Sequence, residues 1–469
     1  MSKIRGGDIR AAGIPDGPAM GVALSCIPRA VKHLGRDVAL QRLAEIAAAP
    51  DRYTDDADFA PLAERLIADA READRRFVER DAPAPYVNYC GDADPGALEQ
   101  MRNSLRLPSA VRGALMPDAH RGYGLPIGGV LETEGTVIPY AVGVDIACRM
   151  KLSVLDVAPE ALDEHGGRLK DALLKQTQFG TGAKLRKRAD HAAMDDDRWA
   201  LTPLARRLRD RAWEQLGTSG SGNHFVEFGL LTLPAPDLGL EAGRYVALLS
   251  HSGSRGAGAQ IAGHYSKLAR ELRPELPKEL SYLSWLDLDH DSGREYLALM
   301  RLMGEYASAC HAVIHERVVG HLKAEVLAGV ENHHNYAWTS ERDGREVVVH
   351  RKGATPAAEG ELGVIPGSMA APGFVVRGKG RPESIDSASH GAGRRMSRKA
   401  ATEQFNWQMV RPVLAERGVE LLSAGIDENP FAYKDIEAVM AQQTDLVDVI
   451  GRFDPRIVRM ADAGERPED

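Results

Sequence analysis

One histidine in this sequence lies among small residues and is followed at once by arginines, a combination suited to phosphate chemistry. The residue is His390, within the segment Ser387–Arg398, which reads SASHGAGRRMSR. Glycine lets a backbone approach an anion closely, and arginine offers a planar fork of donors that matches phosphate oxygens. A helix is expected from Arg394 to about Glu416, and its N-terminus would favour negative charge. His390 is therefore a candidate nucleophile toward phosphorus; the alternative is a glycine-rich turn before a solvated basic helix.

Residue types that bind metals occur at four places further upstream. Asp145 and Cys148 lie three residues apart, close enough to reach one centre from a single turn. His224 lies where a Gly/Ser loop enters an apolar run, His251 just past an expected strand end, and His334 after a long helical stretch. Each histidine alone is what an ordinary loop would carry. Together the carboxylate, thiol and imidazoles suit a two-metal site whose thiolate bridges the ions.

Further motifs over residues 95–450 occur in a specific order. They are MPDAH at 116–120, GYGLPIGG at 122–129, the Asp145/Cys148 segment, GNHF at 222–225, HSGSR at 251–255, HNY at 334–336, HRKGA at 350–354, IPGSM at 365–369 and the His390 segment. One such motif would be weak evidence, whereas the ordered series is highly specific. On these motifs the chain resembles the RtcB family of RNA-splicing ligases, and the resemblance implies that family's α+β fold.

The resemblance implies an RNA ligase that depends on GTP and manganese. Such an enzyme joins an RNA end bearing a 3′-phosphate or 2′,3′-cyclic phosphate to a 5′-hydroxyl end. By the same resemblance, His390 attacks the nucleotide α-phosphate to form a phosphoramidate. The nucleotide then passes to the RNA 3′-phosphate, and the 5′-hydroxyl displaces it. The implied partners are GTP and RNA ends, while any accessory activating protein is unknown.

Family roles carry over to individual positions of this sequence. One Mn²⁺ would bind Cys148, His251 and His334, and the other Asp145, Cys148 and His224. The implied nucleotide contacts are Asn223, Glu227, Ser368, Met369, Ala392, Gly393 and Tyr433, and the implied phosphate contacts are Arg255, Lys352, Arg394 and Arg398. Manganese is implied by the family alone, because the usual affinity order would favour zinc or copper at a His/Cys site.

Three positions depart from the family pattern. Gly373 falls where a serine that contacts guanine is expected, and Pro356 falls where arginine is common. After Met460 the chain continues as an acidic tail to Asp469, whereas the family usually stops at a Lys-Gly pair that contacts the base. All residues that the family pattern implies for metal and phosphate binding are thus present, whereas the residues implied for the guanine pocket differ. The alternative to strict GTP dependence is a relative with a different nucleotide choice.

Two other classes of function use the same residues. In a two-metal phosphoesterase His390 would only stabilise charge, and a non-ligating RNA-end-binding protein would keep the metal site for structure. Familiar nucleotide motifs are missing: the stretch 373–379 mimics the start of a P-loop, but Gly380 replaces the Ser/Thr that binds magnesium. The Lys-x-Asp-Gly signature of ATP-dependent ligases does not occur. A histidine is thus the better candidate for covalent activation of a nucleotide.

Composition is consistent with a large cytoplasmic enzyme. Of 469 residues 43% are hydrophobic, enough for a sizeable core. Four widely spaced cysteines suit a reducing compartment. No apolar run approaches the length of a membrane span, and no secretory signal opens the chain. A net charge of −8 argues against extensive duplex binding. A catalytic cleft needs only a local basic lining, which the residues 184–188 or 394–399 could supply.

Three parts are expected along the chain: a helical N-terminal extension over 1–90, one catalytic core over 91–460 and an acidic tail over 461–469. Helices are expected over 36–49, 59–79, 160–216, 292–328, 395–417 and 435–450, and strands over 136–141, 150–155, 346–350 and 364–377. The inner side of the longest helix would carry Leu297, Met300, Tyr306, Cys310, Val313 and Val318. Strands without regular βαβ alternation predict an α+β core of mixed sheets with surrounding helices.

Overall fold

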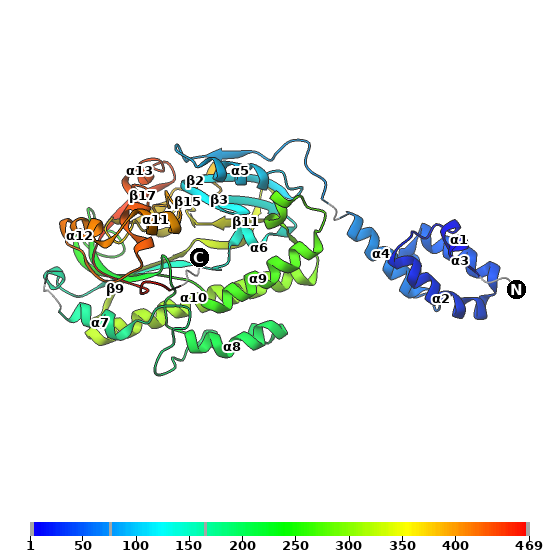
Figure 1. Ribbon diagram of the computed structural model, residues 1–469, viewed down its shortest axis with the longest axis horizontal. Helices are drawn as coiled ribbons and strands as arrows, with labels where there is room; N and C mark the ends of the chain where they lie inside the picture. Colours follow the sequence, from blue (N-terminus) through cyan, green and yellow to red (C-terminus); the bar gives the residue numbers. More distant parts are fainter. Residues whose placement is uncertain (1–3, 75–76, 164–166, 466–469) are drawn as a thin grey trace. The chain divides into compact units, whose positions relative to one another are not determined.

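The computed structural model describes residues 4–74, 77–163 and 167–465 (Figure 1). Contacts divide the chain into two compact units, Met1–Val78 and Glu79–Asp469. The predicted acidic tail lies outside the described residues from position 466 onward. Within the described ranges, no helix combines the length and apolarity that crossing a membrane requires.

The N-terminal unit is a small helical bundle. Its helices are α1 (Gly6–Ala11), α2 (Pro18–Leu34), α3 (Arg36–Ala48) and α4 (Ala60–Asp74), with the 3₁₀ turn η1 (Pro50–Tyr53) before α4. Ile9, Ile27, Leu43, Phe59 and Leu62 are buried together in its core. Gly35 separates α2 from α3 with φ +81°, a backbone conformation that favours glycine. The predicted helices over 36–49 and 59–79 are confirmed from Arg36 to Ala48 and from Ala60 to Asp74; residues 75–76 lie outside the described residues, and residues 77–79 are not helical.

The larger unit contains an extensive, mostly antiparallel sheet with the strand order β13-β14-β17-β6-β7-β5-β9. Its strands are β5 (Arg149–Leu155), β6 (Phe225–Leu233), β7 (Gly243–Ser252), β9 (Val326–His333), β13 (Leu362–Ile365), β14 (Gly373–Gly378), β16 (Glu420–Ser423) and β17 (Val447–Met460), with β16 parallel to β17. Successive residues of β7 point to opposite faces of the sheet: Leu248 packs in one apolar cluster and Leu249 in another. Both faces of the central strands are therefore covered.

A second sheet has the order β1-β2-β3-β11-β10. Its strands are β1 (Tyr86–Asn88), β2 (Ala110–Tyr123), β3 (Leu125–Glu134), β10 (Asn335–Arg342) and β11 (Arg345–Lys352). Two short pairs complete the strands: β12 (Ala354–Pro356) with β15 (Ser387–Ser389), and β4 (Thr136–Val137) with β8 (Leu286–Asp287). His390 follows β15 directly, so this pairing holds the segment that the sequence singled out.

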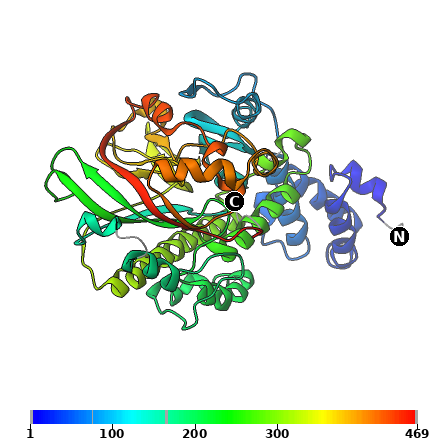
Figure 2. The ribbon, with the colours of Figure 1, turned by 60° about the vertical axis from the view of Figure 1, so that its left-hand side comes forward.

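Helices surround these sheets. They are α5 (Pro95–Ser104), α6 (Pro139–Val142), α7 (Arg168–Gln176), α8 (Pro203–Gln215), α9 (Arg255–Leu272), α10 (Asp291–Leu322), α11 (Arg398–Gln404), α12 (Trp407–Glu416) and α13 (Ile436–Ala441). The short turns are η2 (Pro159–Leu162), η3 (Ala192–Met194), η4 (Asp197–Ala200), η5 (Lys278–Leu283), η6 (Pro382–Ser384), η7 (Ile426–Glu428) and η8 (Pro430–Ala432). Figure 2 shows α10 running beside α9 along the large sheet, where it contacts β5 and β7. All six residues predicted for its inner side are buried.

The expected helix from Arg395 to Arg417 is wrong in its start and its continuity. The first helix begins at Arg398, because the Ser397 hydroxyl accepts the N–H of Ala400 and caps it. A second cap at Asn406 starts α12. The backbone of Arg394 and Arg395 therefore precedes the helix, and the expected anion site at a helix N-terminus does not begin there.

Other boundaries also differ from expectation. The expected helix over 435–450 ends at Ala441, because the following residues pair as β17. The long helix ends at Leu322 and not at Ala328, where β9 has already begun. The expected strand over 364–377 is broken into β13 and β14, and Pro139 starts a short helix within the run expected as strand. In the charged region 160–216, the described residues form the separate helices α7 and α8 with short 3₁₀ turns, while residues 164–166 lie outside the described part of the chain. The α+β class of mixed sheets with surrounding helices is confirmed.

Candidate active site

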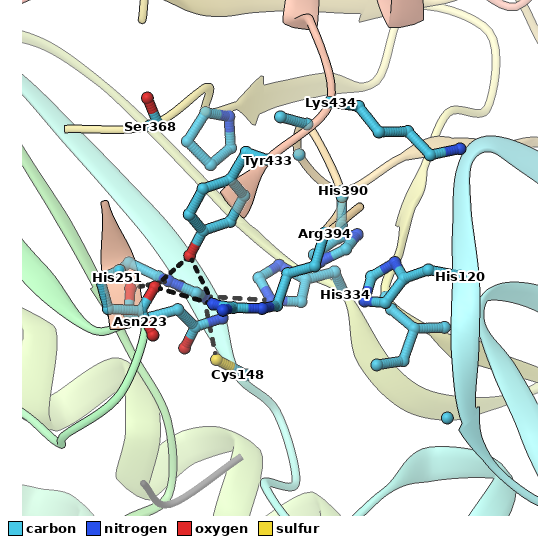
Figure 3. Close-up of a pocket in the computed structure, with 18 of the residues that line it drawn as sticks. His120, Cys148, Asn223, His251, His334, Ser368, His390, Arg394, Tyr433 and Lys434 are labelled. Atoms are coloured by element: carbon cyan, nitrogen blue, oxygen red, sulfur yellow. Dashed lines mark hydrogen bonds and ion pairs between the residues drawn. The ribbon is translucent and has the colours of Figure 1, made fainter. Parts of the chain in front are cut away.

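A cavity of about 1070 Å³ in the larger unit brings most of the predicted site residues together (Figure 3). Its lining includes Asp145, Cys148, Asn223, Glu227, His251, His334, Lys352, Ser368, Met369, His390, Ala392, Gly393, Arg394, Arg398 and Tyr433. His224 does not line the cavity itself but is fully buried in contact with Asp145 and Cys148. Arg255 alone among the predicted residues lies elsewhere.

The predicted metal ligands form one buried cluster. The Sγ atom of Cys148 lies 3.3 Å from His224 Nε2 and 3.1 Å from His251 Nε2. His224 Nε2 is 3.1 Å from an Asp145 carboxylate oxygen, and His251 Nε2 is 3.3 Å from His334 Nε2. The thiol is thus central and shared, as a bridging ligand would be.

The chemistry of this donor set fits metal ions. Burial holds the pKa of His251 and of His334 well below the ordinary value, so both rings are neutral and can act as ligands. The Nε2 atoms of His251 and His334 face each other and cannot both donate a hydrogen, whereas both can offer a lone pair to a cation. The His251 Nδ1–H donates to the Asn223 carbonyl oxygen at 3.0 Å, which leaves Nε2 free to bind. The cluster therefore suits divalent cations with a thiolate ligand.

Neighbouring strand ends explain why residues so distant in sequence meet. His251, near the end of β7, pairs with Met150 of β5 and with Phe225 of β6. Cys148 directly precedes β5, and His224 directly precedes β6. His334 directly follows β9, whose last residue pairs with the first of β5. These four predicted ligands thus lie at the same end of four adjacent strands.

The turn that carries Asp145 is held tightly. The carboxylate of Asp145 accepts the backbone N–H of Ser254 at 3.2 Å. A Cβ atom on Gly253 would lie 1.9 Å from the same carboxylate, so only glycine fits there. Ala147 has φ +59°, a left-handed conformation unusual for a residue with a side chain. Burial alone would raise the pKa of the Asp145 carboxyl, but the interactions with His224, Cys148 and His251 together lower it.

His390 is oriented by a carboxylate to which the sequence reasoning gave no role. The Nδ1–H of His390 donates to Asp118 at 2.6 Å, and the same oxygen accepts the backbone N–H of His390 at 3.0 Å and of Gly391 at 3.3 Å. Asp118 is fully buried; burial alone would raise the pKa of its carboxyl, but the interactions with His390 and His120 together lower it. The Nε2 atom of His390 is the ring nitrogen that the hydrogen bond to Asp118 leaves unused. The rings of His390 and His334 are centred 5.1 Å apart, beside the metal cluster.

The MPDAH motif was the one available signal for Asp118. The carboxylate lies within that motif in β2, whereas its partner follows β15, far away in sequence. No local pattern links the two residues.

Arg394 and Arg398 line the cavity and are held by acidic partners. Arg394 lies 3.3 Å from a Glu428 carboxylate oxygen and donates to the Asp427 carbonyl oxygen at 2.8 Å. Arg398 pairs with the Asp427 carboxylate at 2.8 Å and also with Glu428. The Tyr433 ring lies 5.2 Å from the Arg394 guanidinium, and its hydroxyl bonds to Glu428. These contacts fix both arginines in place before any anion binds.

Lys352 and Arg255 differ in their surroundings. Lys352 lines the cavity, and its Nζ donates to the carbonyl oxygens of Tyr123 and Tyr140. Burial lowers the pKa of this lysine to about 7. Arg255 is buried outside the cavity lining and donates to Gly180 O at 2.6 Å and Thr218 Oγ1 at 3.2 Å. Its predicted phosphate contact stays a prediction.

The cavity lining also carries the predicted nucleotide contacts. Asn223, Glu227, Ser368 and Met369 all line it, together with Gly373. The amide oxygen of Asn223 is buried with no hydrogen-bond partner among the described residues. Burial raises the pKa of the Glu227 carboxyl well above its usual value. This region therefore offers unpaired polar groups to a ligand.

Comparison with known proteins adds to this geometry. A family model described as tRNA-splicing ligase RtcB matches residues 100–461. The RNA-splicing ligase RtcB of Escherichia coli strain K12 is 35% identical over 406 residues, which cover 80% of this chain and 96% of that protein. The tRNA-splicing ligase RtcB of Thermococcus kodakarensis is 30% identical over 434 residues, covering 76% of this chain and 89% of that protein. The RNA-splicing ligase RtcB of Mycobacterium tuberculosis is 31% identical, with 76% and 98% covered.

Proposed function

This chain belongs to the RtcB family of tRNA-splicing ligases and is an RNA ligase, and we propose that it joins RNA ends through a nucleotide bound covalently to His390. The observation that carries the proposal is the hydrogen bond from His390 Nδ1 to the buried Asp118 carboxylate. It leaves the Nε2 lone pair available for attack on phosphorus. It also places a negative charge where the ring becomes positive during that attack.

Two Mn²⁺ ions are proposed as the resident metals. Asp145, Cys148 and His224 would hold one, and Cys148, His251 and His334 the other, since these donor atoms already converge. When bound, the ions would offset phosphate charge and draw electron density from phosphorus. Manganese follows from the family resemblance, because the donor atoms themselves do not distinguish it from zinc.

The proposed reaction has three steps. In the first, His390 Nε2 attacks the α-phosphorus of GTP, a P–N bond forms and pyrophosphate leaves. In the second, an oxygen of the RNA 3′-phosphate attacks the same phosphorus, the P–N bond breaks and the nucleotide passes to the RNA. In the third, the 5′-hydroxyl oxygen attacks the 3′-phosphate phosphorus, and the nucleoside monophosphate leaves. A 2′,3′-cyclic phosphate is first opened by water to the 3′-phosphate.

The cavity lining supplies the remaining roles. Arg394, Arg398 and Lys352 are proposed phosphate contacts, because each places a basic side chain on the cavity wall. The nucleotide contacts proposed are Asn223, Glu227, Ser368, Met369, Ala392, Gly393 and Tyr433. Gly373 lines the same region and lacks the serine hydroxyl that the family pattern places there. We therefore propose that guanine is held less selectively in this chain than the family pattern implies.

A joining assay tests this function. The full chain is incubated with Mn²⁺, each of the four nucleoside triphosphates in turn, and two RNA oligonucleotides that carry a 3′-phosphate and a 5′-hydroxyl. Joined product is expected with at least GTP, absent with His390→Ala and present with His264→Ala, an exposed histidine outside the cavity. Release of phosphate without joining would instead favour the two-metal phosphoesterase.

A further inference from the structure

Beyond the metal cluster, the cavity reaches a group of three tyrosines. Tyr123 and Tyr140 line it next to Lys352 and Gly143, and Tyr282 packs behind them. The ring centroids of Tyr140 and Tyr282 lie 4.9 Å apart, those of Tyr123 and Tyr282 5.5 Å, and those of Tyr123 and Tyr140 6.5 Å. Tyr123 is nevertheless 63% exposed. Its ring is held by aromatic contacts yet leaves most of its surface open.

The fold holds this tyrosine group rigidly. Tyr123 ends β2, and Gly124 continues the chain with φ +68°. A Cβ atom on Gly124 would lie 2.9 Å from the Tyr282 carbonyl oxygen, so glycine lets the turn pack against η5. Lys352 Nζ donates to the carbonyl oxygens of both Tyr123 and Tyr140, which joins the turn to α6. Three separate elements are thus tied around one exposed ring.

Basic side chains accompany these rings. Lys352 Nζ lies 5.4 Å from the centre of the Tyr140 ring, and the Arg270 guanidinium lies 5.7 Å from that of Tyr282. Gly143, beside Lys352, is two residues before the predicted ligand Asp145. Stacking surfaces combined with nearby cations are how proteins hold single-stranded nucleic acid. Tyr123 lines the same cavity as Asp145 and Cys148, so a nucleotide whose phosphate lies at the metal cluster would enter the cavity that Tyr123 borders.

We propose that Tyr123, supported by Tyr140 and Tyr282, stacks on the nucleobase of a single-stranded RNA end that enters the cavity. This inference rests on the proposed function, and it assigns the RNA a contact separate from the nucleotide region around Tyr433. Stacking tolerates any base, since every base has a flat π-face. The same chemistry suits either the 3′-phosphate strand or the 5′-hydroxyl strand, and the experiment separates them.

Fluorescence anisotropy with the full chain provides the test. Two RNA oligonucleotides, one with a 3′-phosphate and one with a 5′-hydroxyl, are each made with a normal or an abasic terminal nucleotide. Tyr123→Ala and Tyr123→Leu are expected to weaken binding of the base-bearing form of one oligonucleotide by about 10-fold. Tyr123→Trp should preserve it, and binding of the abasic form should be unchanged by all three substitutions. The oligonucleotide that responds identifies the strand.

Controls keep this test separate from that of the proposed function. Tyr245→Ala removes a tyrosine of β7 outside the cavity lining and should bind every oligonucleotide as wild type does. Equal binding by Tyr123→Ala and wild type, equal weakening of base-bearing and abasic forms, or no RNA binding by wild type would each overturn the stacking proposal. Nucleotide labelling of the wild-type chain, measured without RNA, fails only if the proposed covalent chemistry is wrong.

Discussion

At the scale of single residues, chemistry depends on which ring nitrogen of His390 is free. The Asp118 carboxylate accepts three N–H groups through one oxygen, two of them from the His390 residue itself. The ring and the backbone of that residue are thereby fixed by a single buried charge. The other carboxylate oxygen of Asp118 has no partner among the described residues.

Substitution of Asp118 should slow transfer of nucleotide to the protein without removing metal. Asp118→Ala leaves His390 Nδ1 without an acceptor, so labelling is expected to slow by about 100-fold. Asp118→Asn keeps an acceptor oxygen but loses the charge, and its rate should lie between those of Asp118→Ala and wild type. Single-turnover labelling and metal analysis measure both properties. Wild-type labelling by Asp118→Ala would show that His390 needs no such partner.

Loss of the central thiolate should remove metal and activity together. Cys148→Ala deletes the one sulfur atom that contacts both His224 Nε2, at 3.3 Å, and His251 Nε2, at 3.1 Å, so bound Mn²⁺ and RNA joining are both expected to fall below detection. Cys310→Ala is the matched control, because this equally buried cysteine of α10 lies outside the cluster. Metal content is measured after dialysis by elemental analysis. Full metal content and activity in Cys148→Ala would refute the shared ligand.

At the scale of elements, strand ends and turns decide which residues meet. Residue types and motif order were enough to predict that the residues from Asp145 to His334 meet in one cluster, because each lies close to small residues near a strand end. The pairing of Asp118 with His390 was not predictable, since β2 and the loop after β15 meet only in the folded chain. The end of α13 at Ala441 was equally unpredictable from local sequence, because the chain that follows pairs as β17 despite its helical pattern.

The buried contacts of His350 in β11 should make the stability of the fold depend on pH. His350 Nδ1 donates to the Leu131 carbonyl oxygen at 3.2 Å, and its Nε2 accepts the Ile138 N–H at 2.9 Å. A proton on His350 Nε2 would face the Ile138 N–H, so the folded chain requires the neutral form of the His350 ring. Burial lowers the pKa of His350 to about 4, against about 6.5 in the unfolded chain. Below pH 6.5 the unfolded state therefore binds the extra proton first, and stability falls until pH reaches about 4.

The difference between wild type and His350→Gln isolates this effect. From pH 7 to pH 4, the thermal unfolding midpoint of wild type should fall further than that of the variant, by the equivalent of about 3 kcal/mol at most. Glutamine also offers a donor and an acceptor, and it does not titrate. Parallel pH profiles for the two proteins would show that protonation of His350 does not destabilise the fold.

At the scale of the whole molecule, the two compact units have separate cores. The apolar cluster of the N-terminal unit runs from Ile9 to Phe59 and on to Ala63, while every residue that lines the active-site cavity belongs to Glu79–Asp469. The family model likewise matches only residues 100–461. The chemistry proposed here is therefore contained in the larger unit.

Removal of residues 1–78 should leave the covalent step intact. The shortened chain is expected to bind Mn²⁺ and to accept nucleotide on protein within about 3-fold of the full-length rate, because no lining residue is lost. Labelling time courses of the two chains at equal concentration measure this. A soluble, folded chain that loses labelling would show that the N-terminal unit contributes to catalysis.

His390 is proposed to carry a nucleotide through a P–N bond beside the Cys148 cluster. The most direct test of this claim is incubation of the full chain with Mn²⁺ and each α-labelled nucleoside triphosphate, followed by mapping of the labelled peptide. The predicted result is acid-labile, alkali-stable label on the peptide that contains His390, absent from His390→Ala and retained in His264→Ala. Label on any other residue, or no label with all four nucleotides, would contradict the claim.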